Sequence, residues 1–185
     1  LGCHALVPML LCELQGDTGA AIVFFAMFLA MSLAAGVRLR YFAILGVLVL
    51  IALPLLWQFG MDEYQKLRFI ALFNLDDPNI RMDAGYQQYQ GRISIGSGKL
   101  TGQGLFHGSR VASNSVPFQQ SDYIFSVAGE ELGFVGCSLI LLLLLLFMAK
   151  VLHVAQTARD DLGKYICFGY FGIIALQSIS NIGMC

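Results

Sequence analysis

Residues 117–147 read PFQQSDYIFSVAGEELGFVGCSLILLLLLLF, so a polar segment leads directly into a helix that is almost pure leucine at its end. A helix needs about 20 apolar residues to cross the hydrocarbon core of a bilayer. The run from Leu139 to Phe147 is typical of a lipid-facing helix. Asp122 lies where the polar segment enters this helix, and an ionisable group at that depth is a candidate functional residue.

The composition of the whole chain points the same way. Hydrophobic residues make up 57% of the sequence and charged residues only 12%, whereas soluble domains contain about 25% charged residues. We therefore expect an all-α polytopic membrane protein. A net charge of −1 without a basic patch argues against a nucleic-acid partner. The five cysteines lie in apolar stretches without metal-ligand spacing, so we expect free thiols and no disulfides.

Apolar runs divide the chain into membrane helices around one long polar segment. We predict a partial transmembrane helix at 1–14, transmembrane helices at 18–37, 41–59 and 133–154, and a truncated transmembrane helix at 165–185. Pro54 is expected to kink the helix at 41–59. Both ends of the chain lie in apolar stretches, so we expect an internal fragment of a multi-helix bundle.

Basic residues in short links indicate the orientation of these helices. The links near 37–41 and 150–164 contain Arg38, Arg40, Lys150, Arg159 and Lys164. Basic residues close to helix ends prefer the cytoplasm. Segment 60–132 is therefore predicted to be extracytoplasmic. Aromatic and aliphatic residues recur along it, which favours a folded cap on the membrane surface over a disordered loop.

Several motifs of the cap have ordinary structural interpretations. Residues 62–73 show a helical pattern, and Asn74–Pro78 is typical of a turn. The glycine-rich stretch 95–104 matches neither a P-loop nor a dinucleotide fingerprint, so we expect a flexible loop. His107 is expected to be a hydrogen-bonded loop histidine and not a metal ligand or base.

Asp122 has two interpretations from the sequence alone. Ser121 or Asp122 is a natural N-cap for the following helix, a role that stabilises it by roughly 1 kcal/mol. Alternatively, Asp122 stands at the outer end of a small, polar helix face that a ligand or another helix can approach closely. An α-helix turns by about 100° per residue. On such a helix five residues point within roughly 80° of one another: Asp122, Ser126, Gly129, Gly133 and Gly136. Glu131 faces away from Asp122 and is expected to be solvated.

Seven short segments occur in the order found in one family of membrane proteins. They are QGDTGA at 15–20, GYQQYQ at 85–90, IGSG at 95–98, GQG at 102–104, SDYIF at 121–125, GEELG at 129–133 and NIGM at 181–184. On these segments the chain resembles the SEDS family (shape, elongation, division and sporulation), whose members include RodA and FtsW. LFHG at 105–108 looks more like RodA than FtsW.

The chain departs from the family pattern at some positions. Phe118 stands where the family usually has Glu, and Gly16 replaces a usual proline. The family's Pro/Gly-rich loop before the last helix does not occur in these residues. This fragment alone is therefore expected to be inactive.

The resemblance implies a peptidoglycan glycosyltransferase that polymerises lipid II at the outer face of the bacterial cytoplasmic membrane, in cell elongation and shape or in division. The family's catalytic aspartate corresponds to Asp122, the expected general base. Arg92 and Lys99 are candidates for phosphate contact, with Ser126 and Glu130 as further substrate-binding candidates. The implied partners are lipid II, a class B penicillin-binding protein transpeptidase and membrane lipid. A divalent cation, Mg or Mn, is the cofactor to consider, although no metal ligands stand out.

Two other classes of function fit a polytopic chain. A flippase or transporter of the lipid-linked precursor should place ionisable groups near the midplane of several helices. Here the spanning helices are almost free of charge and the acids gather at the outer edge, which favours chemistry at the surface. A non-catalytic scaffold for a transpeptidase is the other alternative, and Phe118 in place of Glu supports it.

Overall fold

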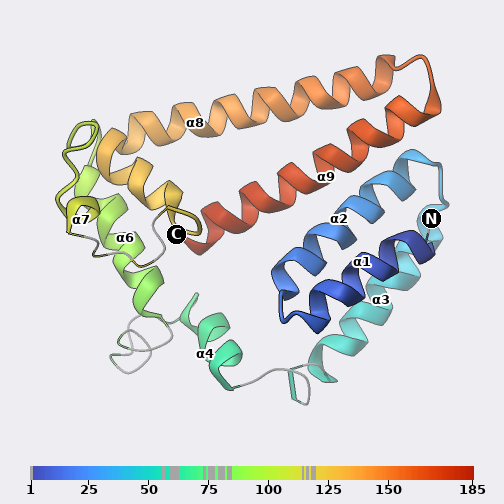
Figure 1. Ribbon diagram of the computed structural model, residues 1–185, viewed down its shortest axis with the longest axis horizontal. Helices are drawn as coiled ribbons and strands as arrows, with labels where there is room; N and C mark the ends of the chain where they lie inside the picture. Colours follow the sequence, from blue (N-terminus) through green and yellow to red (C-terminus); the bar gives the residue numbers. More distant parts are fainter. Residues whose placement is uncertain are drawn as a thin grey trace. The chain divides into compact units, whose positions relative to one another are not determined.

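The computed structural model describes residues 2–55, 57–58, 63–72, 74, 78, 82, 85–113, 115, 117 and 120–185. Within α-helices, the side chains of Cys3, Tyr64, Gln65 and Arg68 fall outside this description. The regular secondary structure of the described residues is entirely helical (Figure 1). The all-α class expected from the sequence is therefore confirmed. The turn predicted at Asn74–Pro78 and the position Phe118 lie wholly or mainly outside the described residues.

The helices follow the apolar and polar segments of the sequence. They are α1 (Gly2–Leu14), α2 (Thr18–Ala34), α3 (Leu39–Leu55), α4 (Glu63–Ala71), α6 (Tyr86–Gly98), α7 (Ser109–Ala112), α8 (Ile124–Thr157) and α9 (Asp161–Met184). Among the described residues, α8 and α9 are long and apolar enough to cross a bilayer. Helix α4 forms within the segment 62–73 that the sequence predicts to be helical. The predicted boundaries of the transmembrane spans and the cap stay predictions.

The chain forms two compact units. Unit 1 consists of Leu1–Leu45 and Leu143–Ser180, and unit 2 consists of Gly46–Leu142 and Asn181–Cys185. Unit 1 contains α1, α2 and most of α9. Unit 2 contains the short helices of the predicted cap together with the first part of α8.

In unit 1, an aspartate N-cap stabilises the start of α2, and small residues allow helices to pack closely. The Asp17 carboxylate accepts a hydrogen bond of 3.0 Å from the Ala20 amide at the start of α2, as is usual for an N-cap aspartate. Helix α1 packs on α2. A Cβ atom at Gly172 of α9 would lie only 2.9 Å from the Ala30 Cβ atom of α2. Small residues permit this close approach of two apolar helices.

The thiols agree with the sequence prediction. Cys12, Cys137, Cys167 and Cys185 are free. The prediction that cysteines in apolar stretches remain unpaired is confirmed for these four residues.

The contact between α2 and α9 predicts a difference between two glycines of the same helix. Gly172→Ala should destabilise the full-length protein by about 1–3 kcal/mol, because the added methyl group meets Ala30 and the Ala26 carbonyl. Gly183→Ala is the matched control, since no atom lies within 4 Å of the added Cβ there. Both changes replace a glycine of α9 by alanine, so the difference in thermal unfolding midpoint in detergent reports mainly on the contact. Equal midpoints for the two variants would contradict this packing.

Candidate active site

Helix α8 is broken near its start. Gly133 has φ 66° and ψ −165°, which is far from helical geometry and rarely adopted by residues with a side chain. The break leaves a short first section, residues 124–132, ahead of the long apolar section that follows. In a continuous helix each N–H donates to the carbonyl four residues earlier. A break here releases the carbonyls of residues 130 and 131 and the amides of residues 134 and 135.

The loop after α6 supplies partners for all four released groups. Two of its amides donate to the free carbonyls, and two of its carbonyls accept from the free amides. The four bonds are Gln103 N–H to Glu130 O (2.9 Å), Gly104 N–H to Glu131 O (3.0 Å), Phe134 N–H to Lys99 O (2.9 Å) and Val135 N–H to Leu100 O (3.1 Å). Loop 99–104 thus replaces, one for one, the helical bonds lost at Gly133.

This exchange requires very close backbone approach. A Cβ atom at Gly98 would overlap the Gly129 carbonyl oxygen, and one at Gly102 would overlap the Glu131 carbonyl oxygen. The prediction of a flexible loop over 95–104 is therefore wrong. Helix α6 continues to Gly98, and the residues after it are bound to α8 through their backbone.

The small-residue face predicted over residues 122–136 does not continue as one helical face, because the helix breaks at Gly133 and Asp122 precedes α8. Helix α6 of the same chain covers the part of it at Ser126 and Gly129. Ser126 is fully buried, and its hydroxyl lies 2.9 Å from the position of a Cβ on Gly91. A Cβ on Gly129 would lie 2.9 Å from the Ile95 side chain. Tyr123 is 1% exposed and also borders Gly91. This part of the face therefore receives a helix in this structure.

Glu130 lies in a buried polar cluster on the first section of α8. Its exposed fraction is 0%, and its Oε1 accepts a hydrogen bond of 2.8 Å from the Arg110 backbone amide. The Arg110 guanidinium donates to Ser94 Oγ at 3.2 Å and to Gln90 Oε1, both on α6. The cluster therefore joins α7 to both longer helices.

Glu131 differs from the prediction. We expected a solvated carboxylate, but the residue is only 8% exposed. Loop 99–104 passes over this part of α8 to reach the break, and the Gly104 amide bonds to the Glu131 carbonyl. The expectation of solvation was wrong because the loop covers a surface that helical periodicity alone leaves open.

Asp122 lies in the turn at residues 120–123, immediately before α8, and is exposed. No side chain or amide in the described part of the chain donates a hydrogen bond to its carboxylate. The first helical amides bond to the Tyr123 carbonyl, so the N-cap position is Tyr123 and not Ser121 or Asp122. Asn181 Nδ2 donates to the Ser121 carbonyl at 3.2 Å, which ties the turn to the end of α9.

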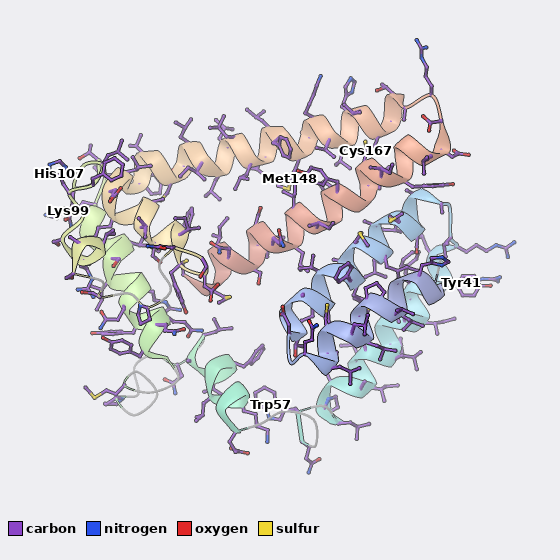
Figure 2. The ribbon with its side chains drawn as sticks, viewed as in Figure 1. Tyr41, Trp57, Lys99, His107, Met148 and Cys167 are labelled. Carbon is purple, nitrogen blue, oxygen red and sulfur yellow. The ribbon has the colours of Figure 1, made fainter. Side chains whose placement is uncertain are left out.

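The two candidate cations are both exposed. Arg92 Nη2 donates to the Leu72 carbonyl at 3.1 Å, and Lys99 follows the last residue of α6. Lys99 and His107 belong to the connection between α6 and α7 (Figure 2). His107 Nδ1 lies 2.7 Å from the Leu105 carbonyl oxygen, so the predicted hydrogen-bonded loop histidine is confirmed.

The described residues do not contain a ligand set for a metal ion. No three His, Cys, Asp or Glu side chains among them lie close enough to hold one.

Comparison with known proteins places the chain in a family. The model of the FtsW, RodA and SpoVE family, described as "Cell cycle protein", matches residues 1–185. The chain belongs to this family. The resemblance expected from the seven sequence segments is thereby confirmed, and the chain is an all-α membrane protein.

Individual members of the FtsW/RodA/SpoVE family align over nearly the whole chain. The peptidoglycan glycosyltransferase MrdB of Escherichia coli is 35% identical over 96% of the chain and 48% of its own length. The probable peptidoglycan glycosyltransferase FtsW of Geobacter sulfurreducens is 33% identical over 96% of the chain and 46% of its length. Stage V sporulation protein E of Bacillus subtilis is 33% identical over 92% of the chain and 45% of its length. The chain spans about half the length of these curated relatives.

The sequence interpretation missed Arg110 and its partners on α6. One signal was available, because a glutamate on a helix face of small residues needs a buried donor. The identity of that donor depends on long-range packing, which brings α7 to α8.

The contact of α6 with α8 predicts unequal effects for two glycines of α6. Gly98→Ala should force the helices apart, because its Cβ would overlap a backbone oxygen, whereas no atom lies within 4 Å of a Cβ at Gly96. We expect Gly98→Ala to cost about 1–3 kcal/mol and to speed hydrogen exchange at the Gln103 and Gly104 amides. Gly96→Ala should not destabilise the protein and should leave the exchange of both amides unchanged. Hydrogen exchange with mass spectrometry on the full-length protein checks this. Equal hydrogen-exchange rates in both variants would contradict the backbone bonds between loop 99–104 and α8.

Proposed function

We propose that the protein containing this chain is a peptidoglycan glycosyltransferase that polymerises lipid II into glycan strands. The observation that carries the proposal is the family match over residues 1–185, with aligned relatives named peptidoglycan glycosyltransferase. The site of action is the outer face of the bacterial cytoplasmic membrane, where the protein is multi-pass. This placement follows from the basic links near 37–41 and 150–164.

The reaction is a displacement at the anomeric carbon of a lipid-linked sugar. The acceptor hydroxyl oxygen attacks that carbon, and the bond from the carbon to the pyrophosphate oxygen breaks. The polyprenyl pyrophosphate leaves with the bonding electron pair. The hydroxyl proton must pass to a base, and positive charge must stabilise the leaving group.

Asp122 is the proposed general base. Its carboxylate is exposed at the start of α8, and no group in the described ranges donates to it. It is therefore free to accept a proton from a sugar hydroxyl. The turn that carries it is anchored on both sides, by buried Tyr123 and by the bond from Asn181 to Ser121.

Arg92 and Lys99 are the proposed contacts of the leaving pyrophosphate, because both cations are exposed. The hydrogen bond from Arg92 to the Leu72 carbonyl uses one guanidinium nitrogen, and the other N–H donors of the guanidinium can bind phosphate oxygens. Substrate contact by Ser126 and Glu130 stays a prediction, and both side chains are buried here. A divalent cation, Mg or Mn, also stays a prediction.

A class B penicillin-binding protein transpeptidase is the proposed protein partner, because the product strands require cross-linking. The resemblance of residues 105–108 to RodA favours a role in elongation and cell shape over division.

The general-base assignment predicts the behaviour of Asp122→Asn in the full-length protein. Polymerisation of lipid II by purified protein should fall about 100-fold or more, which is the usual loss for a missing acid or base. Membrane insertion and the thermal midpoint should stay unchanged, since the carboxylate is exposed. Asp161→Asn makes the same chemical change at the exposed first turn of α9 and should retain activity. Normal polymer yield from Asp122→Asn would refute the assignment.

A further inference from the structure

Glu130 has a feature that the proposed reaction does not use. Its side chain is completely buried, yet among the described residues only one of its carboxylate oxygens has a hydrogen-bond partner. The other, Oε2, has no hydrogen-bond partner in the described part of the chain. A buried polar atom without a partner destabilises a fold. A residue kept at this cost has to contribute something that an apolar residue does not.

The place of Glu130 in the chain indicates what it contributes. It stands on section 124–132 of α8, which begins beside Asp122 and ends at the break at Gly133. This section is roughly 13 Å long at 1.5 Å per residue, and isolated helices of that length are unstable. Because the break interrupts its helical bonds to the rest of α8, contacts with neighbouring elements set its position.

These contacts lie at both ends of the section. At the Asp122 end, Tyr123 and Ser126 pack on Gly91 of α6. At the other end, Glu130 binds the Arg110 amide through its carboxylate and the Gln103 amide through its carbonyl. Glu130 thus joins this end of the section both to α7 and to loop 99–104, and the Glu131 carbonyl adds a second bond to the loop.

Arg110 completes the connection to α6. Its backbone binds Glu130 while its side chain binds Ser94 and Gln90. The Glu130 carboxyl also lies 3.2 Å from the position of a Cβ on Gly108, so the chain before α7 closes over it. Substitution of Arg110 removes only the side-chain contacts, because its bond to Glu130 uses the backbone.

We propose that Glu130 and Arg110 are positioning residues for Asp122. They fix the first section of α8 against α6 and α7, and this orients the turn that presents the carboxylate. The assignment rests on the proposed function, and it is the alternative to substrate contact as the role of Glu130. Misplacement of a reacting group by about 1 Å costs roughly 100-fold in rate, so a positional effect is large enough to measure.

Kinetics of the full-length protein in nanodiscs test the proposal with lipid II as substrate. Glu130→Ala should lower kcat about 10–100-fold and leave KM for lipid II within about threefold, because the substrate site loses no contact. Glu130→Gln keeps an oxygen that accepts from the Arg110 amide and should retain kcat within about threefold. Arg110→Lys should lower kcat in the same way, and it serves as the second variant if Glu130→Ala does not fold.

Glu131→Ala is the matched control, since Glu131 is also a buried carboxylate residue of this section, and its side chain makes no hydrogen bond to α7 within the described residues. It should change kcat less than Glu130→Ala does. A raised KM with unchanged kcat in Glu130→Ala would make Glu130 a substrate-binding residue and overturn the proposal. Equal loss in both alanine variants would also overturn it.

Hydrogen exchange separates this proposal from the proposed function. In Glu130→Ala, exchange should increase at residues 109–113 and 120–123, whatever substrate the protein uses, and Glu130→Gln should match the parent protein. If Asp122→Asn stays active while these amides exchange faster in Glu130→Ala, the general-base assignment is refuted, but the role of Glu130 in holding the turn at residues 120–123 stands. Unchanged hydrogen exchange at both segments in Glu130→Ala would overturn the positioning proposal, even if the enzyme is active.

Discussion

Unit 2 depends on an exchange of backbone hydrogen bonds between the break at Gly133 and loop 99–104. Four polar groups released by the break would each cost about 1–3 kcal/mol if buried without partners. The loop matches all four. Neither feature is stable alone: without the loop the break leaves unpaired groups, and without the break the loop has nothing to bind. The rule that backbone groups near lipid must be satisfied within the protein makes this pairing a strong constraint.

This constraint explains the glycines of α6. In a helix interior, glycine costs roughly 0.5–1 kcal/mol relative to alanine, so the composition of α6 disfavours a helix locally. The close approach of α6 to α8 at Gly98 offsets that cost, because any side chain there would collide with backbone. Packing against α8 therefore overrides local propensity over residues 91–98.

Local sequence patterns predicted the parts of the structure that depend on local physics. Apolar runs predicted the helices, free thiols followed from apolar surroundings, and the charged edge of the leucine helix drew attention to Asp122. The loop at 95–104 and Glu131 were predicted wrongly for a common reason. A glycine-rich sequence is compatible both with a flexible backbone and with close backbone packing. Helical periodicity does not reveal which face of a helix a distant loop will cover. Arg110 was missed because its partners are fixed only by that long-range packing.

The break also separates two physical roles within α8. The long section after Gly133 is apolar and exposed, and its position in a bilayer follows from hydrophobic length. The short section before Gly133 takes its position from α6, α7 and the loop. A carboxylate at the start of a continuous helix would move with every tilt of that helix in the membrane. Asp122 instead precedes a section that buried contacts with α6, α7 and loop 99–104 hold. Under the positioning proposal these elements, and not the lipid, determine its orientation.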